Sequence, residues 1–127
     1  MPARVSFEYA IVRVVPRVDR EEFVNAGVIV FCLERSYLGA RVEVNEARLR
    51  ALFPAVDLDC VARHLRAIPA VCAGEGPIGV LSRRERFHWL VSPRSTVIQV
   101  SPVHSGLCEA PEAALEGLFS RMITLAT

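Results

Sequence analysis

The sequence predicts an α+β fold in which helices pack against a mainly antiparallel sheet. The first observation is the order of the patterns, which is strand-strand-strand-helix-helix-strand-strand-helix instead of a one-by-one alternation. The second is size and composition, since the chain has 127 residues, of which 52% are hydrophobic and 23% charged. This is enough apolar surface for one core and too little chain for two, so we expect residues 1–127 to form a single domain.

The first three predicted elements are strands. An alternation of apolar and more polar residues indicates a strand with one strongly apolar face, made of Val5, Phe7, Tyr9 and Ile11. Residues 23–33 are almost continuously apolar and rich in Val and Ile, which is typical of a central strand buried on both faces. A tight turn at residues 34–36 then leads into a third, more exposed strand at residues 37–44.

The first two strands are expected to form a hairpin around a loop at residues 16–20, with Asp19 at its centre. That register gives three facing pairs on one side of the sheet, namely Arg13 with Asn25, Ile11 with Gly27, and Phe7 with Phe31. Arg13 and Asn25 would then be a polar pair at the end of an otherwise apolar sheet.

Three helices are predicted. Asn45 can cap a short helix that stops at Pro54, and a longer helix begins near Asp57 and is stopped or kinked by Pro69. The last helix starts at Pro111, because the missing N–H of proline is harmless at the first helical position. Its expected buried stripe is Leu115, Leu118, Phe119 and Met122.

Two further strand candidates, residues 86–91 and 96–100, flank Pro93. On a strand at 86–91, Phe87 and Trp89 would share one face, and we expect both in the core. The basic residues 82–86 are expected to form a solvated loop.

Residues 92–106 are the segment best suited to bind a polar ligand. They contain Ser-Pro corners at 92–93 and 101–102, and each proline restricts its own backbone and that of the preceding residue. Arg94 offers a planar set of N–H donors. The same segment also offers the amide of Gln99, the imidazole of His104, and the hydroxyls of Ser95, Thr96 and Ser101. We expect these groups to meet the hairpin pair in one partly exposed, anion-compatible site, with candidate ligands Arg13, Asn25, Arg94, Ser95, Thr96, Gln99, Ser101 and His104.

A simpler interpretation of the same segment is that its prolines and hydroxyls only terminate strands, with Arg94 paired to a carboxylate. His104 is a candidate general base, yet a Ser-His pair needs an orienting carboxylate and oxyanion donors, which the spacing does not reveal. The sequence therefore leaves open whether the protein is an enzyme.

No metal or cofactor is expected. Cys60-x-x-x-His64 and His104-x-x-x-Cys108 would together allow a tetrahedral zinc site, but the chain has no close Cys-x-x-Cys pair. The glycines of residues 74–79 match a dinucleotide motif as a string but follow a helix instead of a strand, so a turn is expected there.

Charge and hydropathy narrow the choice of partners and compartment. Lys and Arg total 15 against 14 Asp and Glu, a net charge of +1 that gives no global field to attract nucleic acid or an anionic membrane. The N-terminal residues do not read as a signal peptide, and the longest apolar run, residues 26–33, is too short to span a bilayer as a helix. We expect a cytoplasmic protein with four reduced cysteines.

Four motifs carry a resemblance to a known family: Tyr9-Ala10-Ile11-Val12-Arg13-x-x-Pro16, Glu22-x-Val24-Asn25-x-Gly27-Val28, Gly76-Pro77-Ile78 and Phe87-x-Trp89-Leu90-x-x-Pro93-Arg94-Ser95-Thr96-x-Ile98-Gln99-x-Ser101-Pro102-x-His104-x-Gly106. Together they resemble the bacterial family catalogued as domain of unknown function 3037, over nearly the whole chain. That family has no established activity. The resemblance implies an accessory role beside HipA-like serine/threonine kinases, whose genes sometimes lie next to those of the family.

The leading hypothesis is therefore a cytoplasmic accessory or binding module with an anion-compatible pocket, which partners a HipA-like kinase or binds a small anionic ligand. One alternative is a small hydrolase or transferase that acts on an anionic substrate, with His104 as general base and Arg94 as charge stabiliser. A second alternative is a nucleic-acid-binding regulatory partner.

Overall fold

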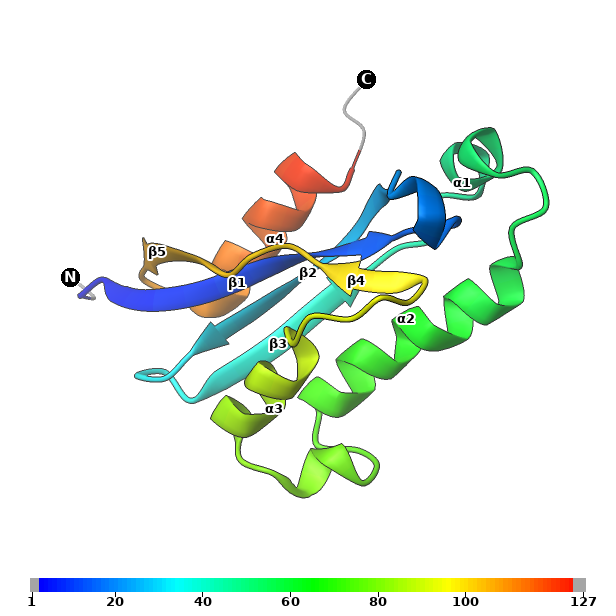
Figure 1. The fold of residues 1–127 in the computed structure, drawn as a ribbon. Helices are drawn as coiled ribbons and strands as arrows, with labels where there is room; N and C mark the ends of the chain where they lie inside the picture. The colour runs from blue at the N-terminus through cyan, green and yellow to red at the C-terminus, as the bar shows by residue number, and fades with distance from the viewer. Residues whose placement is uncertain (1–2, 125–127) are drawn as a thin grey trace.

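One antiparallel sheet with helices on both faces organises the computed structural model, which describes residues 3–124 (Figure 1). The sheet order is β3-β2-β1-β4, and β5 pairs with the other half of the same edge of β1. The strands are β1 (Val5–Val14), β2 (Val24–Cys32), β3 (Tyr37–Val42), β4 (Ile98–Val100) and β5 (His104–Cys108). The predicted α+β class with an antiparallel sheet is confirmed.

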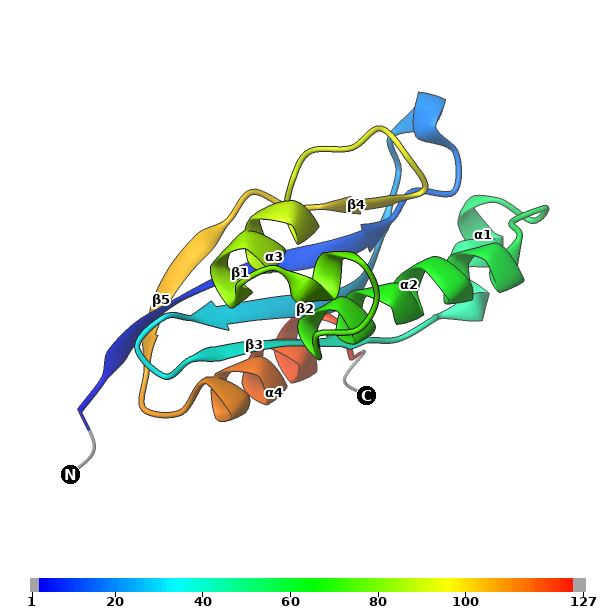
Figure 2. The same cartoon turned by 90° about the horizontal axis from the view of Figure 1, so that it is seen from below.

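The helices divide between the two faces of the sheet (Figures 1 and 2). One face packs against α1 (Glu46–Leu52), α2 (Leu58–Cys72) and α3 (Arg83–Leu90), and the other against α4 (Pro111–Met122). Short 3-10 turns, η1 (Val18–Arg20) and η2 (Ile78–Val80), complete the described elements. Each face therefore has its own apolar core, and the sheet separates them.

Strand β2 is buried on both faces, as its continuous apolar pattern predicts. Ile29 and Phe31 pack toward α1–α3, whereas Val28 and Val30 pack toward α4. All four side chains are essentially inaccessible to solvent. The alternation follows from the strand period of two residues, and it makes β2 the structural centre of the protein.

The predicted hairpin register is correct at its open end and wrong farther along. Arg13 does pair with Asn25, but the ladder then skips Ala26, so Gly27 faces Val12 instead of Ile11. Likewise, Phe31 faces Glu8 and not Phe7. The cause is a bulge, in which one residue of β1 faces two of β2.

The bulge also decides the direction of Asn25. Val24 and Ala26 join the core beneath α1–α3, and the Asn25 side chain reaches the α4 side, where it donates to the Met122 carbonyl. A regular strand would have placed Asn25 on the same face as Gly27 and Ile29.

The strand predicted at residues 86–91 is wrong, because this segment is the end of α3. The helix begins with a capping box, in which the Ser82 hydroxyl and the Glu85 carboxylate each accept the other residue's backbone N–H. Phe87 is fully buried, but Trp89 is 41% exposed, because positions two apart do not share a helix face. Arg86 is buried as well, so the basic stretch is not the solvated loop that was predicted.

Other helix and strand ends differ in detail. Helix α2 begins after its Asp57 cap as predicted, but it continues through Pro69 to Cys72. The predicted third strand ends at Val42, and β5 was not predicted at all. Helix α4 begins at Pro111 as predicted, although Met122, expected in its buried stripe, is 40% exposed.

Candidate functional site

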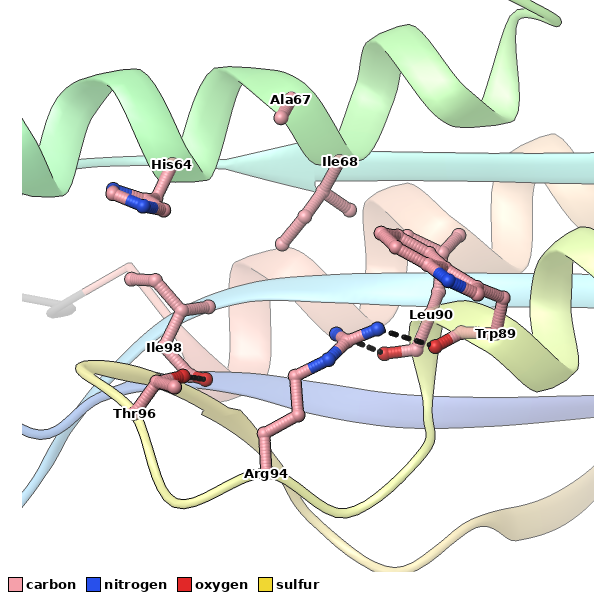
Figure 3. Close-up of a pocket in the computed structure, with 8 residues that line it drawn as sticks. All are labelled: His64, Ala67, Ile68, Trp89, Leu90, Arg94, Thr96 and Ile98. Carbon is pink, nitrogen blue, oxygen red and sulfur yellow. Dashed lines mark hydrogen bonds between the residues drawn. The ribbon is translucent and has the colours of Figure 1, made fainter. Parts of the chain in front are cut away.

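A cavity of about 280 Å³ lies where α2, the end of α3 and β4 come together (Figure 3). Helix α2 supplies one wall, and the loop that connects α3 to β4 supplies the opposite one. The lining residues are His64, Ala67, Ile68, Trp89, Leu90, Arg94, Thr96 and Ile98. We call this cavity the Arg94 pocket.

Apolar groups dominate the floor of the Arg94 pocket. Ile68 and Leu90 are buried members of the core beneath α1–α3, and Ile98 packs against the same core. The Trp89 indole stands at the rim, partly exposed. The pocket is therefore an opening at the edge of this core and suits an apolar body.

Arg94 supplies the positive charge of the pocket. Its Nη2 donates to the Trp89 carbonyl at 2.7 Å and its Nη1 to the Leu90 carbonyl at 3.4 Å. A cation at the last carbonyls of a helix is favourable, because these groups have no partner in the helix and carry partial negative charge. Arg94 thus pairs with backbone carbonyls and not with a carboxylate of the described residues. A guanidinium has five N–H donors, so others remain for a ligand.

His64 faces the pocket from α2 and was not among the predicted site residues. Its Nδ1 lies 2.8 Å from the Cys60 carbonyl oxygen and 3.5 Å from the Cys60 Sγ. A hydrogen bond to a carbonyl requires a proton on Nδ1, so the neutral ring carries its free lone pair on Nε2. The Cys60-x-x-x-His64 spacing was considered only as half of a zinc site.

A second polar group lies on the other face of the sheet. Arg13 pairs with Asn25 on β2 and with Gln99 on β4, so the three side chains form a row across three strands. Gln99 Nε2 donates to the Thr96 carbonyl at 2.9 Å, as Asn25 Nδ2 does to Met122 at 3.4 Å. Each amide therefore has one N–H engaged and one left.

Arg13 is the centre of this row. Its guanidinium carbon lies 4.2 Å from the centroid of the Phe23 ring, a cation–π contact. Its Nε atom is buried and has no hydrogen-bond partner among residues 3–124. None of the ion pairs formed within that range involves Arg13.

The remaining predicted residues have different surroundings. His104 is exposed on β5 and faces Tyr9 of β1 in the sheet. The centroids of the His104 and Tyr9 rings are 5.3 Å apart. Ser101 is buried, where its hydroxyl accepts from the Ile11 N–H and donates to the Pro102 carbonyl. Ser95 is exposed in the loop before β4.

The prediction that Arg13 and Arg94 share one site is wrong. Val12 and Val14 point into the core beneath α1–α3, so Arg13 between them points to the α4 side. Arg94 packs against α3 on the opposite side. The structure therefore brings Arg13, Asn25 and Gln99 together, places His104 on the same face, and puts Arg94 with Thr96 in the pocket on the other face.

The two Cys/His pairs are also on opposite faces. Cys60 and His64 lie on α2, whereas His104 and Cys108 lie on β5 with side chains on the α4 side. Residues 3–124 contain no cluster of three or more His, Cys, Asp or Glu side chains suited to a metal ion. All four cysteines are free thiols, and burial raises the pKa of Cys72 to about 12.

Across the described residues, no helix is both long enough and apolar enough to pass through a membrane. The model of a family described as "Protein of unknown function (DUF3037)" matches residues 9–123. Neither a curated protein nor a solved structure matches the chain.

Proposed function

The chain belongs to the DUF3037 family of proteins of unknown function, and we propose that it is a cytoplasmic binding module for a small ligand. The ligand has an apolar body and one anionic group, and it occupies the Arg94 pocket. The observation that carries this proposal is an apolar cavity with a guanidinium and an imidazole at its rim.

The size and lining of the pocket support a small, mostly apolar ligand. Ligand sites usually enclose about 300–1,000 Å³, so a cavity of about 280 Å³ suits a body the size of a phenyl ring. Ile68, Leu90 and Ile98 offer apolar contact, and the remaining N–H groups of Arg94 can donate to a carboxylate or phosphate. Because two Arg94 donors hold the end of α3, the guanidinium is oriented before the ligand arrives.

The geometry favours binding over the hydrolase or transferase alternative. That alternative uses His104 as base and Arg94 as charge stabiliser, and these two residues lie on opposite faces of the sheet. The Ser101 hydroxyl, three residues before His104, is buried and engaged in two hydrogen bonds inside the fold. The nucleic-acid alternative gains no support from a net charge of +1.

The family resemblance adds a HipA-like kinase as the proposed protein partner. Co-expression of the chain with a kinase encoded beside a family member tests this part separately. We expect the two to co-elute in size-exclusion chromatography. Separate elution at micromolar concentrations would contradict the partnership and leave the ligand proposal untouched.

Titration with small aromatic anions tests the ligand proposal. Benzoate, phenylacetate and phenyl phosphate are the probes, and benzyl alcohol is the neutral control. In ¹H–¹⁵N NMR spectra we expect the anions to shift the amides of residues 64–68 and 89–98, with benzyl alcohol at least ~10-fold weaker, since a charged hydrogen bond is worth about 1.5–3 kcal/mol.

Two variants assign that binding to the charge at the rim. Arg94→Gln should weaken the anions to the level of benzyl alcohol, whereas Arg66→Gln, on the exposed face of α2, should leave their affinity unchanged. Equal binding of neutral and charged probes, or binding of none of them, would overturn the proposal.

A further inference from the structure

We propose that the face of the sheet beside α4 is a docking surface for an acidic segment of a partner protein, with one carboxylate of that segment bound by Arg13. The surface is a groove between α4 on one side and β1 with β5 on the other. It is separate from the Arg94 pocket, and neither proposal depends on the other.

The docking surface continues from this groove along the α4 side of β1, where Tyr9 and Ile11 lie between Phe7 and Arg13. At one end is a hollow of about 560 Å³ with Phe7 at its base, and at the other end is the Arg13 row. Phe7 and Arg13 are six positions apart on the same face, which corresponds to about 20 Å at roughly 3.3 Å per residue. Helix α4 runs beside β1 in the same direction, since Ala110 lines the hollow and Met122 accepts from Asn25. The groove has room for about six extended residues.

The wall formed by α4 is low, which leaves the groove open to a polypeptide. Four of the lining residues at and after the start of α4 are small, namely Ala110, Ala113, Ala114 and Gly117, and Leu118 and Arg121 complete this wall. A methyl group added at Gly117 would meet no atom within 4 Å. The helix surface around Gly117 is therefore open.

The charges along the groove are mainly positive. Arg4 and Arg121 line the hollow with one acidic residue, Glu109, and Arg13 lies at the far end. The opposite flank of α4 differs, because Glu116 there is already paired with Arg41 of β3. The groove is thus complementary to an acidic segment, although the whole chain is almost neutral.

Arg13 gives this complementarity a defined position. A buried N–H without a partner loses its hydration and gains nothing in return, so a ligand that accepts from it is favoured. Because Nε has no surface open to solvent, a carboxylate reaches it only when the groups that cover it move, and it then accepts from Nε and an Nη of the guanidinium together. The Phe23 ring holds the guanidinium in place, and Asn25 and Gln99 each have a further N–H beside it.

A protein segment fits this surface better than a nucleic acid. The arginines do not form one basic cluster, since Arg4 and Arg121 line the hollow and Arg13 lies at the other end, where the exposed Phe23 ring is already stacked on its guanidinium. An apolar base between spaced cations suits side chains of alternating character. The partner is therefore assigned by chemistry as a segment with acidic and apolar residues.

Selection from a library of random peptides displayed on phage tests the proposal with the whole chain. We expect enrichment of peptides rich in Asp and Glu. The best of them, labelled with fluorescein, is then measured by anisotropy against the wild type and against Arg13→Gln, Arg121→Gln and Arg66→Gln. Arg66 is a matched control, since it is an exposed arginine on the helix that packs against the other face.

The expected result is a loss of affinity of at least ~10-fold for Arg13→Gln, a smaller loss for Arg121→Gln and no change for Arg66→Gln. Enriched peptides without an acidic excess, no enrichment, or equal losses for all three variants would overturn the proposal. Tighter binding of a labelled oligonucleotide than of the selected peptide would also overturn it. Circular dichroism of each variant ensures that lost binding is not lost folding.

Discussion

The guanidinium of Arg94 lies over the indole of Trp89, 4.4 Å from the ring centroid, and donates to the backbone carbonyl of the same residue. Arg94 therefore holds both the side chain and the main chain of Trp89. This contact between the end of α3 and the loop that follows it forms one side of the pocket rim, opposite His64 of α2 (Figure 3).

Replacement of Arg94 should be visible in the fluorescence of Trp89, the only tryptophan of the chain. In Arg94→Ala we expect a red-shifted emission, because the indole loses its cover, and a stability loss of about 1 kcal/mol from the cation–π contact and the carbonyl bonds. Emission spectra and thermal unfolding measure both. Arg66→Ala should change neither. An Arg94→Ala chain that fails to fold would show that Arg94 is a structural residue first.

Gly27→Val should destabilise the sheet by about 1–3 kcal/mol, the usual cost of overpacking. A Cβ at Gly27 would lie 2.7 Å from the Arg41 carbonyl oxygen and 2.7 Å from Val42 Cγ1, so backbone as well as side chain must move. Urea unfolding measures the change. An unchanged urea midpoint would mean that β3 moves away from the new side chain with no loss of stability.

Gly117→Ala should have the opposite effect, because space is open around Gly117 in the interior of α4. Alanine is favoured over glycine in a helix by about 1 kcal/mol, so the urea midpoint should rise. This variant also tests whether the flank of α4 beside the groove is free. A lower midpoint would show that this flank is already packed.

Arg86→Met should lower the free energy of unfolding by about 3 kcal/mol. The Arg86 side chain, 8% exposed, donates to the carbonyls of Val71 and Cys72 at the end of α2 and to that of Leu81. Methionine keeps most of the volume but removes all three hydrogen bonds, and of these carbonyls that of Val71 still accepts from the Gly74 N–H. Denaturant unfolding against Arg83→Met, an exposed neighbour, isolates the effect. Equal losses of unfolding free energy in Arg86→Met and Arg83→Met would contradict this prediction.

Stability should fall as pH rises from about 9 to about 12, in part because of Cys72. Burial raises the pKa of this thiol from 9.0 in the unfolded chain to about 12 in the fold, so between these values the unfolded chain releases a proton that the folded chain keeps. Cys72→Ala should flatten that part of the pH profile. Unfolding curves at pH 8, 9 and 10 measure it, and parallel profiles for the two proteins would refute the assignment.

Local chemistry made some elements predictable. Asn45, Asp57 and Pro111 start helices through groups within their own first turn, and all three positions are correct. The capping box of Ser82 and Glu85 is equally local, but it conflicts with the alternation of Phe87 and Trp89, which favours a strand. The capping box predicts the observed helix. The strand would have buried both aromatic residues on one face, but only Phe87 is buried and Trp89 is exposed.

The sites depend on information that no short segment carries. Strand alternation and the turn centre were enough to pair Arg13 with Asn25, yet only the bulge at Ala26 puts Asn25 on the α4 side. The Arg94 pocket needs α2 and α3 to pack together, and the sequence pattern does not specify that distance. For this reason the α2 sequence alone does not identify His64 as a pocket residue.

Strand β4 is only three residues long, and it belongs to both sites. Ile98 lines the Arg94 pocket, and the next residue, Gln99, lies beside Arg13 on the opposite face. The two sites thus share one short piece of backbone as a common wall. Because Ile98 and Gln99 are joined by one peptide bond, a shift of the strand that moves Ile98 in the pocket also moves Gln99 beside Arg13.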